Sequence, residues 1–291
     1  MQPDFADALR RFDALAGRDD ESIHARGGTI LLGHGRPTAR AVVLLHGLTA
    51  SPMQCDALAR RLHAAGDTVL VPRLPGHGAR DRLTSQLREL RGAHLLDAAC
   101  EALAIARGLG TTVVVAGFSL GGLLAAWLAQ HERFDHAVAI APFLGVAGIP
   151  RGATATLAAA LRALPNRFLW WDPIRRERLM PDHGYPRYPT HAIAEALVIA
   201  TALVGQARTA PPATRRITIV TNASESAVSN AAARALARSW DAHAERSVEM
   251  HRITGLPPSH DVIEPLRPGT LARRAYRTLL PILHGDRTDR G

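Results

Sequence analysis

Lysine is absent from this chain of 291 residues, so all 35 of its basic residues are arginines. They exceed the 26 acidic residues and give a net charge of +9, a balance that can indicate a nucleic-acid or membrane-surface partner. However, the arginines are scattered singly and in pairs instead of forming a stripe, and no nucleic-acid-binding motif is present. A coding bias toward arginine explains the charge, and we expect no nucleic-acid partner.

The chain also has only two cysteines, and it lacks both the residue spacing of a metal site and a long apolar run. Cys55 and Cys100 lie in alanine-rich, helix-like stretches, which favours two buried thiols over a disulfide. No Cys/His cluster has the spacing of a zinc site. We find no run of eighteen apolar residues, so stable membrane insertion is not expected. Residues 1–7 lack the basic and apolar regions of a secretory signal, which favours a cytoplasmic location.

Short apolar runs alternate with longer helical patterns along most of the chain. This alternation predicts an α/β fold with a mostly parallel central sheet and helices on both faces. The expected strands are Ala41–Leu45, Thr68–Pro72, Thr112–Ala116, Ala137–Ala141, Ile217–Thr221 and Ser247–Ile253. The expected helices are Pro52–Ala65, Leu87–Leu109, Leu120–Glu132, Val228–His243 and Thr270–Leu283, with an amphipathic helix at Phe5–Ala16 ahead of one or two edge strands.

The stretch 143–212 interrupts this rhythm. Two helix-like pieces, Thr154–Leu164 and Thr190–Ala207, flank a middle rich in proline, tryptophan and tyrosine, and no strand is expected there. We interpret the stretch as a helical cap over the carboxyl edge of the sheet, inserted into a core made of residues 1–142 and 213–291. The alternative is a region that simply packs on the core.

The pentapeptide Gly117-Phe118-Ser119-Leu120-Gly121 stands between an expected strand and an expected helix. This is the arrangement of a nucleophile elbow, a sharp strand-to-helix turn that presents a serine hydroxyl at the edge of the sheet. Glycines suit the two flanking positions because side chains there would collide with the neighbouring strand and helix. Ser119 is therefore the candidate nucleophile.

A serine nucleophile needs a base, and the base needs an acid. His260 follows the last expected strand, in a loop that can reach the same edge of the sheet, and is the candidate base. In this kind of fold the acid lies between the serine and the histidine in the sequence, after a strand. Glu225 is the only acidic residue of the loop after Ile217–Thr221, whereas Asp241 comes too late and Asp261 is expected to point away from its neighbour His260.

The loop His46-Gly47-Leu48-Thr49 follows an earlier strand. With an elbow serine, the two backbone N–H groups that bind an oxyanion come from such a loop and from the residue after the nucleophile. We therefore expect the amides of Leu48 and Leu120 in these roles, and His46 as a structural histidine that braces the loop.

Four motifs in this order, His46–Thr49, Arg73-Leu74-Pro75-Gly76-His77-Gly78, Gly117–Gly121 and Ser259-His260-Asp261, resemble the α/β-hydrolase superfamily. The resemblance covers roughly residues 40–145 and 215–285. Within the superfamily it is in particular to the branch of monoacylglycerol lipases and bacterial carboxylesterases, which is serine aminopeptidase-like (S33 type). The acid of these relatives is usually an aspartate in a D-x-x-V setting, where this chain has Glu225-Ser226-Ala227-Val228. No catalytic role is carried over to His77.

These residues predict hydrolysis of a carboxylic ester through an acyl-enzyme on Ser119, with His260 and Glu225 completing a triad. No metal or organic cofactor is expected. The apolar and aromatic composition of residues 143–212 favours an apolar acyl ester or a monoacylglycerol-like lipid. A thioesterase, an amidase or aminopeptidase, a carbon–carbon bond hydrolase or an acyltransferase fits the same motifs, and a non-catalytic binding protein with this fold is a remote alternative. The motifs leave the oligomeric state open.

Overall fold

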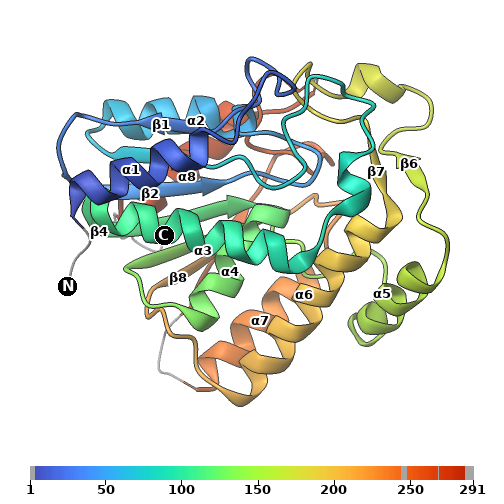
Figure 1. Cartoon of the computed structure of the whole chain (residues 1–291). Coiled ribbons are helices and arrows are strands. Elements are labelled where there is room, and N and C mark those ends of the chain that lie inside the picture. Colours follow the sequence, from blue (N-terminus) through green and yellow to red (C-terminus); the bar gives the residue numbers. More distant parts are fainter. Residues whose placement is uncertain (1–3, 244–247, 268, 286–291) are drawn as a thin grey trace.

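A seven-stranded sheet forms the centre of the molecule (Figure 1). The computed structural model describes residues 4–243, 248–267 and 269–285. The strand order is β1-β3-β2-β4-β5-β8-β9, and all pairs are parallel except β1 with β3. The strands are β1 (Ile30–Leu32), β2 (Thr38–Leu45), β3 (Thr68–Val71), β4 (Gly110–Phe118), β5 (His136–Ile140), β8 (Ile217–Asn222) and β9 (Val248–Ile253).

Helices cover both faces of this sheet, because alternate strand residues are apolar on each side. One face, with Val43 and Val115, packs with α1 (Phe5–Ala16), α3 (Gly92–Leu109), α4 (Leu120–His131) and α7 (Asn230–Asp241). The opposite face, with Val42 and Val114, packs with α2 (Met53–Ala64) and α8 (Ala272–His284). The predicted fold class is therefore confirmed.

The element boundaries differ from the prediction where capping or tertiary contacts decide them. The helix expected at Leu87–Leu109 is a 3-10 turn, η1 (Gln86–Glu89), followed by α3. The helix expected from Val228 begins after Ser229, whose hydroxyl caps α7 by accepting from the amide of Ala232. Ser247, the first residue of the last expected strand, lies outside the described residues. Cys55 is a buried free thiol, as expected, whereas Cys100 is only half-buried.

The stretch 143–212 connects β5 to β8 and lies outside the main sheet (Figure 1). It contains η2 (Arg151–Ala153), α5 (Thr154–Ala163), β6 (Phe168–Trp170), η3 (Arg176–Leu179), β7 (Arg187–Pro189) and α6 (Thr190–Thr209). The expectation of no strand here is wrong, since β6 and β7 pair antiparallel. Each has only three residues, too few to show a period in the sequence. The division into core and cap stays a prediction.

Among the described helices, α6 alone has the length and apolar composition that would let it cross a membrane. A core helix meets the same criterion, and α6 packs against α4, α5 and α7. Its buried side includes Ile199, Ala200 and Leu203, which join the main apolar core. These contacts explain the apolar composition of α6 without a membrane.

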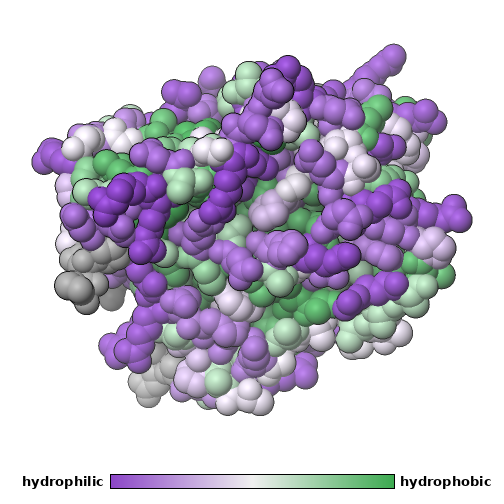
Figure 2. All heavy atoms as spheres, viewed as in Figure 1, coloured by the Kyte–Doolittle hydropathy of each residue, from purple (hydrophilic) through white to green (hydrophobic). Residues whose placement is uncertain are grey.

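Many arginines pair locally with carboxylates, among them Arg18 with Glu101, Arg40 with Asp67 and Arg73 with Asp19. Figure 2 shows hydrophilic residues spread over the face viewed in Figure 1, with smaller apolar areas between them. Part of the positive charge of the arginines is thus balanced by neighbouring carboxylates.

Candidate active site

Ser119 occupies a strained turn between β4 and α4. Its φ of 56° and ψ of −111° are unfavourable for a residue with a Cβ. Its amide donates to the carbonyl of Ile140 at 2.9 Å, and its own carbonyl accepts from the amide of Phe143 at 3.0 Å, which holds the strained backbone. A Cβ at Gly117 would overlap the carbonyl of Gly121, so the turn requires the glycine. The serine side chain is thereby lifted from the sheet into a cavity.

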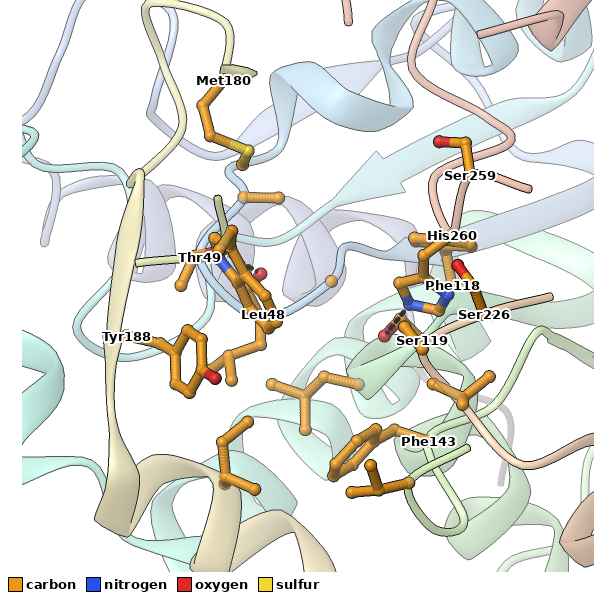
Figure 3. A pocket seen from close by; sticks show the side chains of 18 of the residues that line it. Leu48, Thr49, Phe118, Ser119, Phe143, Met180, Tyr188, Ser226, Ser259 and His260 are labelled. Carbon is orange, nitrogen blue, oxygen red and sulfur yellow. Dashed lines mark hydrogen bonds between the residues drawn. The ribbon is translucent and has the colours of Figure 1, made fainter. Parts of the chain in front are cut away.

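Ser119, His260 and Glu225 meet in one hydrogen-bonded chain (Figure 3 shows the first two). The Nε2 of His260 lies 2.7 Å from the Oγ of Ser119, and its Nδ1 lies 3.0 Å from Oε2 and 3.1 Å from Oε1 of Glu225. A carboxylate only accepts hydrogen bonds, so Nδ1 carries the proton. Nε2 is then the acceptor of the serine hydroxyl, as a general base must be.

The carboxylate of Glu225 is held in place by the loop that follows β8. Its side chain is 0% exposed, and its Oε1 accepts from the amides of Ala227 at 2.8 Å and Val228 at 3.3 Å. Burial raises the pKa of Glu225, but the hydrogen bond to His260, the attraction of that ring and the two amides outweigh it, so the pKa lies below its usual value. Glu225 is therefore an ionised partner for the imidazole.

The two other acidic candidates lie elsewhere. Asp241 is exposed at the end of α7. The buried carboxylate of Asp261 accepts from Gln54 Nε2 at 2.8 Å and from the amides of Ile263 and Glu264, whereas Nδ1 of His260 pairs with Glu225. Gln54 in turn accepts from the amide of Gly47 at 2.8 Å. Asp261 thus links the histidine loop to the loop after β2.

Leu48 and Leu120, the two expected oxyanion donors, line the same cavity as Ser119. Leu120 is the first residue of α4, where backbone N–H groups have no partner within the helix. Within the described part of the chain, neither amide donates to a protein acceptor. The positive end of the α4 dipole adds to the potential there. The arrangement suits a negative charge that develops beside Ser119.

His46 braces the loop after β2. Its Nε2 accepts from the amide of Leu74 at 3.1 Å, so its Nδ1 donates to the carbonyl of Gly47 at 2.9 Å. Burial, helped by the neighbouring ring of His77, holds the pKa of His46 well below its usual value. Burial also lowers the pKa of His77 to about 4. Both imidazoles are therefore neutral structural groups.

The cavity in front of Ser119 has a volume of about 650 Å³. Its wall is mostly apolar, and much of it comes from residues 143–212, including Leu157, Leu161, Leu169, Met180, Tyr188 and Ile193. Figure 3 shows Leu48, Phe143 and Tyr188 around the space that Ser119 faces. Composition indicated an apolar lining but not which side chains form it, because no motif marks them. Among the described residues, no group of three or more His, Cys, Asp or Glu side chains could hold a metal ion.

Comparison with known proteins agrees with this architecture. The sequence profile of the Alpha/beta hydrolase family matches residues 42–276, and the chain belongs to this family. A thermostable monoacylglycerol lipase of Bacillus sp. (strain H-257) is 34% identical over 100 residues, which make up 31% of this chain and 35% of that lipase. The match therefore spans only a minor part of the lipase.

Two solved structures share the fold over most of the chain. A metagenome-derived lipolytic enzyme has a TM-score of 0.69 and 18% identity, with 90% of this chain and 99% of that one covered. The monoacylglycerol lipase of Paleococcus ferrophilus has a TM-score of 0.66 and 16% identity, with 89% and 98% covered. The predicted resemblance to the α/β hydrolases, with monoacylglycerol lipases among the relatives, is confirmed.

Proposed function

We propose that this protein is a serine hydrolase that cleaves carboxylic esters with an apolar acyl group, monoacylglycerol-like lipids among them. The observation that carries the proposal is the hydrogen-bonded chain from Ser119 through His260 to Glu225 at the wall of an apolar cavity. The lipases and lipolytic enzymes among the relatives support the ester as the reacting group.

The proposed reaction runs in two steps through an acyl-enzyme. The Oγ of Ser119 forms a bond to the ester carbonyl carbon while its proton passes to Nε2 of His260. The amides of Leu48 and Leu120 bind the oxyanion of the tetrahedral intermediate. The bond to the alcohol then breaks, and the alcohol leaves with the proton from His260.

Water completes the cycle. His260 removes a proton from a water molecule, whose oxygen attacks the acyl carbon, and the acid leaves as Ser119 regains its proton. The ionised Glu225 fixes the tautomer of His260 and stabilises the imidazolium in both steps. The apolar wall supplied by residues 143–212 gives the acyl chain a place to lie, and we assign to this stretch the role of a cap over the site.

A substrate panel tests this function. We expect p-nitrophenyl esters of rising acyl length and 1-monoacylglycerols to be hydrolysed, with kcat/KM increasing with chain length until the cavity is filled, and we expect no turnover by Ser119→Ala. Acyl-CoA thioesters and an aminoacyl anilide belong in the same panel. A higher kcat/KM for either class than for the esters would reassign the leaving group, and product transfer to an added alcohol would indicate an acyltransferase.

A further inference from the structure

Thr49 has an unfavourable backbone conformation beside the proposed oxyanion donor. Its φ of 65° lies in the left-handed region, which a β-branched residue avoids. It directly follows Leu48, which lines the same cavity as Ser119 and whose amide is the proposed donor. Such a conformation persists only where surrounding contacts impose it. Those contacts therefore also restrain the backbone of Leu48, which adjoins Thr49.

Residues 143–212 supply two of the hydrogen bonds that hold Thr49. The indole Nε1 of Trp171 donates to the Oγ1 of Thr49 at 2.8 Å, and the amide of Tyr185 donates to its carbonyl at 2.7 Å. The hydroxyl itself donates to the carbonyl of Leu48 at 2.6 Å. Thr49 is only 1% exposed, so water does not replace these partners. A relay thus runs from the indole through the hydroxyl to the carbonyl of Leu48, and it restrains the backbone of the residue that carries the proposed donor N–H.

Trp171 is itself fixed. Its ring lies against Tyr188, with the ring centroids 4.1 Å apart, and its amide donates to the carbonyl of Pro186 at 3.1 Å. The phenol of Tyr185, in the same stretch, accepts from the amide of Ala79 at 2.8 Å and donates to the carbonyl of Gly76 at 3.1 Å. This part of the stretch is therefore anchored to the core and can act as a rigid support.

We propose that Trp171 is a positioning residue for the hydrolysis: its indole N–H holds the hydroxyl of Thr49 and thereby aims the Leu48 amide at the oxyanion. The inference rests on the proposed function, because it assigns Trp171 a part in the same reaction. The stretch 143–212 thereby has two roles. By lining the cavity it affects which ester binds, and through the contact of Trp171 with Thr49 it affects how fast the bound ester reacts.

Two substitutions remove the hydrogen bonds of the relay with a limited change of side-chain shape. Trp171→Phe keeps an aromatic ring and deletes the N–H, and Thr49→Val keeps the β-branch and deletes the hydroxyl. With p-nitrophenyl acetate as substrate, we expect each substitution to lower kcat about tenfold, which is the effect of losing one well-placed hydrogen bond. We expect KM to change less than twofold. The double variant should lose no more than either single one, because both changes delete the same contact.

The control is Trp170→Phe. Trp170 is the neighbouring tryptophan, does not line the cavity, and its indole N–H has no acceptor among the described residues, so we expect unchanged kcat. Thr49→Ser keeps the hydroxyl and should retain kcat, which separates loss of the hydrogen bond from loss of folding if Thr49→Val is unstable.

Binding of inhibitors gives an independent readout. A short alkyl trifluoromethyl ketone forms an oxyanion on addition of Ser119, and we expect about tenfold weaker inhibition of Trp171→Phe, with unchanged inhibition by the acid product. A Trp171→Phe variant with wild-type kcat and a raised KM would overturn the inference, as would losses that multiply in the double variant. The proposed function would instead be refuted if the wild type hydrolysed no ester, or if Ser119→Ala still hydrolysed esters.

Discussion

Replacing Glu225 by glutamine keeps the size of the side chain but should disable His260. The amides of Ala227 and Val228 both donate to Oε1, so the carbonyl oxygen of the glutamine must take that position. Its NH₂ group then occupies the position of Oε2, 3.0 Å from Nδ1 of His260 in the wild type. There it donates to Nδ1 and favours the tautomer with the imidazole proton on Nε2, in competition with the contact of 3.1 Å between Nδ1 and the carbonyl oxygen.

A proton on Nε2 faces the hydroxyl of Ser119, so His260 can no longer accept the serine proton. Loss of the carboxylate in this way lowers kcat by about 10⁴-fold in a triad of this kind, or about 5.5 kcal/mol of activation free energy. Glu225→Asp keeps the charge but withdraws the carboxylate by about one carbon–carbon bond, for which we expect a smaller loss of about 10- to 100-fold.

The assay is steady-state hydrolysis of p-nitrophenyl butyrate, with circular dichroism and thermal unfolding to verify the fold of each variant. Asp241→Asn is the matched control, since it makes the same chemical change at an exposed carboxylate and should leave kcat unchanged. If Glu225→Gln kept activity within tenfold of the wild type, or if Asp241→Asn lost activity instead, the assignment of Glu225 would be wrong.

Three further predictions concern the base, the elbow and the buried histidines. His260→Ala should lower kcat by at least about 10⁴-fold without unfolding, and near-normal rates would exclude His260 as the base. Gly121→Ala should destabilise the fold by about 3 kcal/mol or more in urea unfolding, because the added Cβ overlaps the carbonyl of Leu45; a wild-type midpoint would contradict the packing of the elbow. Burial lowers the pKa of His77 to about 4 and of His136 to about 3, so below about pH 6.5 the unfolded chain binds more protons than the native one. The free energy of unfolding should therefore fall from pH 6.5 toward 4 by up to about 2.7 kcal/mol per pH unit, as measured by urea titration at several pH values; constant stability from pH 7 to 5 would contradict this.

Local signals in the sequence predicted much of the fold. The bounds of α1 are as expected because Asp4 accepts from the amide of Ala6 at its start and Gly17 follows its end. The parallel strands were recognisable as apolar runs, and the elbow as a serine between two glycines. Ser119, Glu225 and His260 each follow a strand of the parallel sheet, and the ends of these strands lie at one edge. Their meeting was therefore predictable from the sequence.

Features that depend on distant contacts were not predictable. The start of α3 at Gly92 coincides with a hydrogen bond of 2.7 Å from its amide to Glu195, 103 residues further along the chain. The pairing of β6 with β7 and the hydrogen bond from Trp171 to Thr49 likewise connect residues that no sequence motif marks. A sequence pattern reports which face of an element is apolar, but not which side chain of another segment will reach it.

The central claim, that the hydroxyl of Ser119 is the nucleophile, is tested most directly by locating a covalent adduct. The protein is treated with an alkyl fluorophosphonate and digested, and the modified peptide is identified by mass spectrometry. We expect a single adduct on Ser119, formed much more slowly in Glu225→Gln and absent from Ser119→Ala. An adduct on another residue, or labelling that persists in Ser119→Ala, would contradict the mechanism.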